Sequence, residues 1–416
     1  MAERPSRTIL ANIVSDIMAE HPTDAYRRAM AAVTPRKLWQ AEPGDCVVML
    51  APCTPAFREY VESVTGLDTS QVDIVAPEEV RGVHALDVVR DLGAEHLLAS
   101  RPELQPFVPD RPVLEFGRRT GVRVLPYTKL PGGGMLDALR LINTKRGFRE
   151  TAAGLGLPVA EGGYAESQAE LVSSIKEFLT TRPAAIIKNN RSSNGFGNVV
   201  IRSGGPKTPE EQLAEALAGQ AERDGGWVYE EFLPFTATPS IEMNIDDAGP
   251  TYFYSCDQRT VNNAWTGMVT PAEEGPFHKE LMRAAEAIGG WLHSHGYRGI
   301  FDVDCGVHEG GYVVTEANVR RTGGTYLEEL ARRMRPGDSP VHWRADVRLS
   351  TGSLDFASAV ARLASAGLAD SSSAARVLLT ADTRAVDGKW RYLVVGRDAQ
   401  SVAEVERQAE IILGIG

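Results

Sequence analysis

Two neighbouring stretches of the sequence decide the fold: residues 299–305 (GIFDVDC) and residues 312–324 (YVVTEANVRRTGG). Both begin with runs of apolar and β-branched residues, and the turn signal Glu-Gly-Gly lies between them at 309–311, so together they predict an antiparallel β-hairpin. Side chains alternate across a strand. Asp302 and Asp304 therefore share a face of the first strand, and Glu316 and Asn318 share a face of the second.

This hairpin brings oxygen donors together beside cations. Carboxylate and amide oxygens suit Mg²⁺, an ion that usually also binds nucleotide phosphates and water. Arg320 and Arg321 follow the donors directly, where a guanidinium group could meet a phosphate. The alternative is a hairpin with polar outer faces. The combination of acids, an amide and two arginines at one place favours a site for metal and phosphate.

A lysine closes another apolar strand, at residues 184–188 (AAIIK). A buried ammonium group costs free energy unless it has a partner, and a phosphate is a natural partner for Lys188. A predicted hairpin with a small-residue tip follows, and its backbone N–H groups can approach phosphate oxygens closely. Its candidate phosphate-binding residues are Ser192, Ser193, Gly195 and Gly197. The alternative is an ordinary flexible hairpin.

Two weaker features belong to the same pattern. Lys145 lies in a helix predicted over 135–155, where a solvated helix lysine is the simpler interpretation. Residues 227–233 (WVYEEFL) predict a strand that ends in paired carboxylates. Glu230 and Glu231 could accept the exocyclic amine of adenine while backbone groups contact the ring edge, or they could form a solvated strand end.

Composition excludes several classes of partner. The 416 residues include 44 Lys and Arg against 55 Asp and Glu, a formal net charge of −11. This acidity argues against nucleic acid and anionic membranes as partners, but it does not speak against a small-molecule phosphate ligand held by a few local cations. Four scattered cysteines without a C-x-x-C pair predict neither a disulfide framework nor a zinc site. No apolar run reaches about 18 residues, and the first residues lack a signal-peptide core, so we expect a cytoplasmic protein.

The order of elements predicts three units. Strand-like segments at 46–50, 72–75 and 122–125 alternate with helices, which is typical of a small parallel α/β domain. A run of glycines at 132–134 marks its end. Later strands at 241–245, 251–256, 299–307, 312–316, 376–379 and 390–395 lie beside helices and predict an α+β region. We expect boundaries at 1–132, 133–232 and 233–416.

In this order, the features resemble the ATP-grasp ligases over about residues 140–330. Members of that family carry two phosphate lysines, a Gly-rich hairpin, an E-E-x-L-like adenine clamp and a D…E-x-N-x-R block. The resemblance implies two α+β lobes that clamp ATP, and the α/β front resembles the Rossmann-like pre-ATP-grasp domain that commonly precedes them. It also implies ATP and Mg²⁺ as cofactors.

The resemblance assigns roles residue by residue. It implies phosphate or nucleotide contacts for Lys145, Lys188, Ser192, Ser193, Gly195, Gly197, Glu230, Glu231, Phe232, Leu233 and Glu242, the last at the ribose. It implies magnesium ligands at Asp302, Glu316 and Asn318, with Asp304 as an alternative or additional ligand. Lys188 and Arg320 are the candidate catalytic cations. The family often has an arginine two residues before the metal aspartate; here Ile300 stands there, and Arg298 is the nearest candidate.

Within the superfamily the chain looks most like bacterial peptide ligases of the pheganomycin type. The E-A-N-x-R-R-T-G-G form and the segment 387–396 (DGKWRYLVVG) favour this. The resemblance implies an ADP-forming ligase that joins a carboxylate to a peptide amine through an acyl phosphate, in natural-product biosynthesis. Related ligases are often homodimers. The alternatives are a ligase that forms a thioester or carboxyphosphate, and a non-catalytic nucleotide-binding module. Arg259 is a candidate carboxylate anchor, with a structural ion pair as the alternative.

Overall fold

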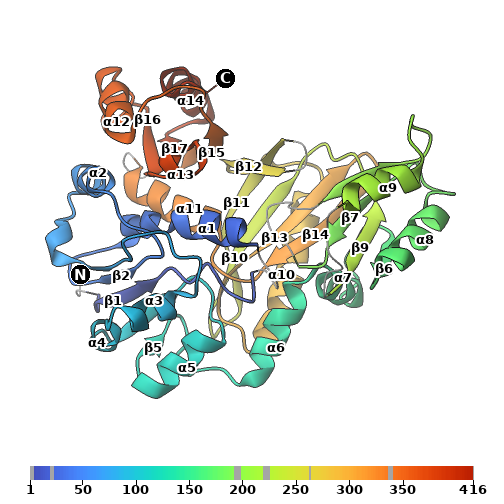
Figure 1. Cartoon of the computed structure of the whole chain (residues 1–416), viewed down its shortest axis with the longest axis horizontal. Coiled ribbons are helices and arrows are strands. Elements are labelled where there is room, and N and C mark those ends of the chain that lie inside the picture. Colours follow the sequence, from blue (N-terminus) through green and yellow to red (C-terminus); the bar gives the residue numbers. More distant parts are fainter. Residues whose placement is uncertain are drawn as a thin grey trace.

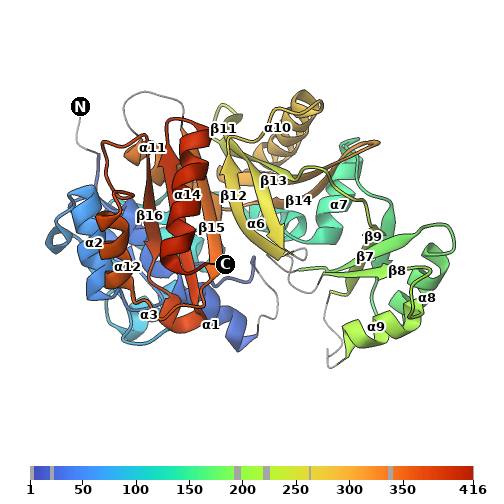
Figure 2. The ribbon, with the colours of Figure 1, turned by 90° about the horizontal axis from the view of Figure 1, so that it is seen from above.

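The computed structural model of the chain describes residues 4–18, 23–191, 198–218, 225–261, 264–335 and 341–415. They form three sheets that follow one another along the chain. Two views at right angles place the first sheet and the C-terminal segment at one end of the molecule and the second sheet at the other (Figure 1 and Figure 2). None of the helices in these ranges has the length and apolar composition to cross a membrane.

The first sheet has five strands in the order β3-β2-β1-β4-β5, and its neighbouring strands are parallel, as predicted for the front of the chain. Its strands are β1 (Arg7–Leu10), β2 (Cys46–Val48), β3 (Asp73–Val75), β4 (Glu103–Pro106) and β5 (Arg123–Val124). Its helices are α1 (Asp24–Ala32), η1 (Thr34–Gln40), α2 (Pro55–Thr65), η2 (Thr69–Gln71), α3 (Ala85–Asp91), α4 (Glu95–Ala99) and α5 (Arg111–Thr120). Strands β1 and β4 were not among the strands predicted from the sequence.

The long helix expected over 135–155 is wrong, because the chain forms two helices there: α6 (Gly133–Ile142) and α7 (Lys145–Gly154). The side chain of Thr144 caps α7 by accepting a hydrogen bond from the backbone N–H of Gly147, at 3.0 Å. A Cβ at Gly147 would lie 2.2 Å from the carbonyl oxygen of Leu141, so the close approach of the two helices requires glycine there. The break places Lys145 at the first residue of α7.

The second sheet has four antiparallel strands in the order β6-β9-β7-β8. Its strands are β6 (Gly162–Ala165), β7 (Ala184–Asn189), β8 (Val199–Arg202) and β9 (Trp227–Glu231), with helices α8 (Gln168–Phe178) and α9 (Pro209–Leu217). A small apolar core, which includes Leu171, Ile187 and Trp227, joins the sheet to these helices. The strands predicted at 184–188 and 227–233 are present as β7 and β9.

The third sheet has eight strands in the order β14-β13-β10-β11-β12-β15-β17-β16, and its neighbours are antiparallel. Its strands are β10 (Pro239–Ile245), β11 (Pro250–Val261), β12 (Ala264–Thr270), β13 (Gly299–His308), β14 (Gly311–Asn318), β15 (His342–Leu349), β16 (Ala375–Ala381) and β17 (Lys389–Gly396). Its helices are α10 (His278–Ser294), α11 (Gly323–Met334), α12 (Phe356–Ser365), α13 (Arg384–Asp387) and α14 (Ala399–Leu413). The hairpin predicted from residues 299–324 is therefore present as β13 and β14.

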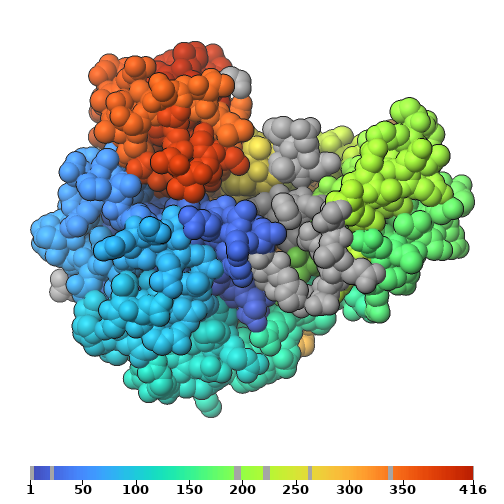
Figure 3. Space-filling model, viewed as in Figure 1, coloured from blue at the N-terminus to red at the C-terminus, as the bar shows by residue number. Residues whose placement is uncertain are grey.

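The front of the chain packs directly against its C-terminal part, and the two meet on one side of the surface (Figure 3). Trp39 lies edge-on against Phe57 and Tyr60 in an apolar core that also contains Trp343 and Trp390. The Nε1–H of Trp39 donates to the carbonyl oxygen of Thr380 at 3.1 Å. The C-terminal strands therefore form part of the support for the front sheet.

We predict that Trp39→Phe lowers the free energy of unfolding by about 1–3 kcal/mol, because it leaves the Thr380 carbonyl buried without its donor. Thr380 lies where the β16–β17 register shifts, so this carbonyl is outside the regular pairing. Urea unfolding measures the change. The control is Ile411→Ala, a side chain that is 78% exposed, with an expected effect within about 0.5 kcal/mol. Equal effects of the two substitutions would contradict the prediction.

Candidate functional site

The β13–β14 hairpin brings the predicted oxygen donors together. The strand register sets Asp302 opposite Asn318 and Asp304 opposite Glu316. The backbone N–H of Asn318 donates to Asp302 Oδ1 at 3.0 Å, and its side-chain amide donates to Asp304 Oδ2 at 3.3 Å. On the other side of β13, Glu242 of β10 lies opposite Asp302. Two neighbouring strand pairs thus gather four carboxylates and one amide.

These carboxylates carry more negative charge than their surroundings balance. Burial and the charge of Glu242 raise the pKa of Asp302 to about 7, against the opposing effect of Arg320. Burial and the charges of Asp302 and Glu316 raise the pKa of Asp304 well above its usual value. Groups that repel one another in this way are stabilised by a bound cation, and carboxylate and amide oxygens are the donors that Mg²⁺ prefers. The residues present fit that ion by donor type.

A different set of acids, away from the β13–β14 hairpin, has carboxylate oxygens close enough together to hold one metal ion, judged over the described ranges. The carboxylates of Asp346, Glu406 and Glu410 lie within 4.8 Å of one another. Arginines already neutralise that set, as described below. For Asp302, Asp304 and Glu316 to share one ion, their side chains would have to rotate toward it.

Two cations lie beside the hairpin, one at the start of helix α7 and one directly after β14. Lys145 Nζ, at the start of α7, lies 3.5 Å from Glu316 Oε2. Arg320 is buried directly after β14, where its Nη1 donates to Asn143 Oδ1 at 3.3 Å. The Nε of Arg320 is buried and has no hydrogen-bond partner. The break between α6 and α7 therefore supplies both Lys145 and the anchor for Arg320.

Lys188 is bound to a residue for which the sequence predicted a different role. Its ammonium group forms an ion pair with Glu230, and Arg149 Nη1 lies 2.6 Å from the other carboxylate oxygen of Glu230. The structure thus directs the carboxylate of Glu230 toward Lys188 and Arg149, whereas we expected it to accept from the adenine amine. Sequence reasoning missed Arg149, although its position four residues after Lys145 places both on one face of a helix.

The other residues that were predicted to contact the nucleotide lie in different surroundings. Glu231 pairs with Arg182 across 3.5 Å, and it lines the cavity together with Phe232 and Leu233. The carboxylate of Glu242 accepts from Thr322 at 2.7 Å and from Tyr254 at 3.3 Å, and its Oε1 is buried without a partner. Glu242 does not line the cavity. Ser192, Ser193, Gly195 and Gly197 lie outside the described residues.

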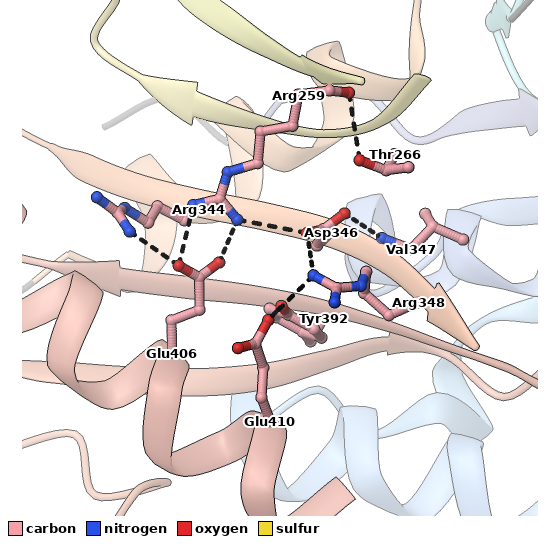
Figure 4. A network of polar contacts seen from close by, with 9 residues as sticks. All are labelled: Arg259, Thr266, Arg344, Asp346, Val347, Arg348, Tyr392, Glu406 and Glu410. Carbon is pink, nitrogen blue, oxygen red and sulfur yellow. Dashed lines mark hydrogen bonds and ion pairs between the residues drawn. The ribbon is translucent and has the colours of Figure 1, made fainter. Parts of the chain in front are cut away.

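Two predicted arginines lie away from this cluster. Arg298 forms an ion pair with Asp247 at 3.0 Å and does not line the cavity. Arg259 lies 2.6 Å from Glu406 and 3.3 Å from Asp346, in the network of Figure 4. Arg259 therefore makes the structural ion pair that was the alternative to a carboxylate anchor.

The other predicted residues line one cavity of about 940 Å³, whose wall is formed by residues of all three sheet units. On its wall lie Lys145, Lys188, Glu230, Glu231, Phe232, Leu233, Asp302, Asp304, Glu316, Asn318 and Arg320. Lysines from two elements, an arginine and a set of oxygen donors thus face the same space. Such a wall can bind a polyanion together with a divalent cation.

Family models match two parts of the chain. The Pre ATP-grasp domain matches residues 34–122, and the PGM1 C-terminal domain matches residues 358–409. A search of curated protein sequences finds no match. The first match covers most of the parallel sheet and its helices. The second covers α12, β16, β17 and most of α14.

Solved structures resemble nearly the whole chain. A biotin carboxylase from Campylobacter jejuni, in complex with β-γ-ATP, has a TM-score of 0.64 and 13% identity, and the match covers 99% of this chain and 92% of that chain. N5-carboxyaminoimidazole ribonucleotide synthetase from Thermus thermophilus has a TM-score of 0.57 and 16% identity, covering 92% and 97%. The Aspergillus clavatus N5-carboxyaminoimidazole synthase, with ADP and 5-aminoimidazole ribonucleotide, has a TM-score of 0.59 and 14% identity, covering 99% of both chains.

These structures define the class of fold. The chain has the ATP-grasp fold, and a Pre ATP-grasp domain forms its front. The predicted fold class is confirmed: a parallel α/β unit precedes two antiparallel regions with helices. At 13–16% identity, the likeness concerns the fold and leaves the reaction to be argued from the site.

We predict that Glu230→Gln lowers the free energy of unfolding at pH 7 by about 3–5 kcal/mol, because two buried cations lose their counter-charge. Burial alone would raise the pKa of Glu230, but the charges of Lys188 and Arg149 outweigh it and lower the pKa. The stabilisation is therefore complete above the unfolded pKa, about 4.3, and is lost as the pH falls through the lower folded pKa.

Urea unfolding of both proteins from pH 7 down to pH 3 tests this prediction. The difference between wild type and Glu230→Gln should be constant above about pH 5 and shrink below about pH 4. Glu231→Gln, on the next residue and only loosely paired, serves as the control, with an effect below about 1 kcal/mol. A difference that grows as the pH falls would contradict the assignment.

Proposed function

We propose that this chain is an ATP-dependent, ADP-forming carboxylate–amine ligase. One observation carries the proposal: a single cavity in an ATP-grasp fold is lined by two lysines, an arginine and a set of oxygen donors, which are Lys145, Lys188, Arg320, Asp302, Glu316 and Asn318. The domain boundaries at 1–132, 133–232 and 233–416 are part of the proposal, since each of these ranges holds one of the three sheets.

The proposed reaction has two steps. A carboxylate resists attack by an amine because oxide is a poor leaving group. An oxygen of the carboxylate therefore bonds to the γ-phosphorus of ATP as the bond to the bridging oxygen breaks, giving an acyl phosphate and ADP. The amine nitrogen then bonds to the acyl carbon and loses a proton as the C–O bond to phosphate breaks. The products are an amide and inorganic phosphate.

The residues of the cavity act mainly by position and charge. Lys145, Lys188 and Arg320 would neutralise the charge that develops on the transferred phosphoryl group. Asp302, Glu316 and Asn318, with Asp304 beside them, would hold Mg²⁺. When bound, this ion would offset phosphate charge as a Lewis acid. Glu230 and Arg149 hold Lys188 in place, so that Lys188 is ordered before a nucleotide enters.

The finer part of the proposal concerns the substrates. We propose that a carboxylate-bearing, amino-acid-like building block is joined to the N-terminus of a peptide in natural-product biosynthesis. Two features support this reading: the chain resembles pheganomycin-type ligases in the 387–396 segment, and that segment lies within the residues matched by the PGM1 C-terminal domain. An ADP-release screen of carboxylic acids against peptides, thiols and bicarbonate, followed by product mass, separates this ligase from thioester and carboxyphosphate formation.

We predict that Lys188→Ala and Glu316→Ala each lower kcat for ADP release by about 10²–10³-fold, the usual loss when one transition-state contact is removed. The matched control is Lys176→Ala, an exposed lysine that pairs with Glu210 on the outside of the second sheet unit. It should keep wild-type turnover. Circular dichroism and urea unfolding show whether each variant is folded. Folded variants with wild-type ADP release would disprove the assignment.

We also predict that chelation of divalent cations stops ADP release and that added Mg²⁺ restores it. Calorimetry of ADP binding with and without Mg²⁺ gives a second readout. Asp302→Asn should weaken the magnesium-dependent part of ADP binding by about tenfold or more, because a carboxylate ligand is lost. Magnesium-independent ADP binding should not change. The same experiment with Asp304→Asn decides whether that residue is an additional ligand.

A further inference from the structure

The same cavity is lined by a second group of residues, apart from those that face the proposed nucleotide. This group lies where the front domain meets strands β16 and β17, which we call the C-terminal hairpin. Arg36 of η1, Tyr326 of α11 and Asp346 of β15 belong to it. Lys389 and Arg391 of β17 complete it. We call these five residues the second arm. None of them is among the residues that face the proposed nucleotide, although both parts belong to one continuous cavity.

The acids in and beside this arm already have partners. Asp346 lies 3.3 Å from Arg259 and 3.4 Å from Arg348, and Figure 4 shows both arginines directed at its carboxylate. Asp387, at the end of α13, lies 2.6 Å from Arg391. The negative charges of the arm are therefore neutralised within the protein.

Two of its cations have no such partner. The guanidinium of Arg36 stacks on the ring of Tyr326 at 4.5 Å, which fixes its plane without neutralising its charge. Among the described residues, no ion pair joins the guanidinium group of Arg36 or the ammonium group of Lys389 to a carboxylate; Asp387 Oδ1 accepts a hydrogen bond from the backbone N–H of Lys389, at 3.1 Å. Burial lowers the pKa of Arg36; Tyr326 opposes this effect, and the nearby charge of Arg391 adds to it.

The arm is also rigid, because it is built where two distant parts of the chain are bonded together. Besides the bond from Trp39, the hydroxyl of Thr54 donates to Asp382 at 2.7 Å, and the backbone N–H of Leu379 donates to the Tyr60 hydroxyl at 3.2 Å. Helix α1 also packs against α13. A cationic site held in this way is ordered before a ligand arrives, which reduces the entropy cost of binding.

We infer that the second arm binds an anionic group, a carboxylate or a phosphate, on the amine substrate, with Arg36 and Lys389 as its direct contacts. This inference rests on the proposed ligase function. The carboxylate to be phosphorylated must lie near Arg320 and Lys188, at the other end of the cavity. An amine substrate that also carries an anionic group would be oriented in the cavity in two ways. The cations of the second arm attract its anionic group, and they repel its ammonium group toward the acids of the β13–β14 hairpin.

Steady-state kinetics of ADP release tests the site. The amine substrates are amino acids and dipeptides, each as the free acid and as the C-terminal amide, together with aminoalkylphosphonates. Arg36→Met and Lys389→Met should each raise KM for the free acids by about tenfold or more, with little change in kcat and none in KM for the amides. Arg397→Met, which removes an exposed cation just beyond β17, is the matched control and should behave as wild type.

A binding measurement on the full chain separates failure of this inference from failure of the ligase function. Calorimetry with saturating Mg-ADP compares alanyl-alanine, alanyl-alaninamide, acetate and inorganic phosphate. We expect the wild type to bind an anionic probe at least about tenfold more tightly than the amide, and both variants to lose this preference. A preference for phosphate over acetate identifies the anion as phosphate, and the reverse order identifies a carboxylate.

One outcome is that no amine supports ADP release, while the wild type prefers the anionic probe and both variants lose that preference. In that case the proposed ligase function is wrong and the anion site is confirmed. If the wild type binds acid and amide equally, the inference is overturned. Equal effects of the variants on KM for acids and amides would also overturn it, because those substitutions would then act through general damage to the cavity.

Discussion

The need to balance buried charge governs the arrangement of this molecule. A buried ion without a partner costs several kcal/mol, and several charged groups of the cavity lie where another element supplies a counter-charge. Within the second sheet unit, Glu230 of β9 balances Lys188 of β7 and Arg149 of α7. Between units, Lys145 of α7 meets Glu316 of β14. In the β13–β14 hairpin acids outnumber cations, and a bound metal ion would complete the balance there.

Local sequence patterns were enough to predict the β13–β14 hairpin and the parallel front sheet. The period of two in a strand placed Asp302 and Asp304 on one face, and the structure sets them opposite Asn318 and Glu316. The parallel front sheet followed from the alternation of short strands and helices.

Features that depend on partners far away in the chain could not be predicted in this way. A carboxylate on β9 was equally compatible with an adenine amine and with Lys188, and only the pairing of β7 with β9 decides between them. Strand β15 escaped prediction because it alternates charged residues, such as Arg344 and Asp346, whose partners lie on β11 and α14. The helix break at Thr144 was missed because a helical pattern of apolar residues continues on both sides of it.

The bonds between the front sheet and the C-terminal hairpin also have a consequence for how the chain is made. Trp39 and Thr380 are separated by 341 positions in the sequence, and ribosomes add about 5–20 residues per second. The aromatic face formed by Trp39, Phe57 and Tyr60 therefore emerges roughly 20–70 s before the strand that covers it. During that interval the nascent chain presents an exposed aromatic surface, which is covered only when residues 375–396 have been synthesised.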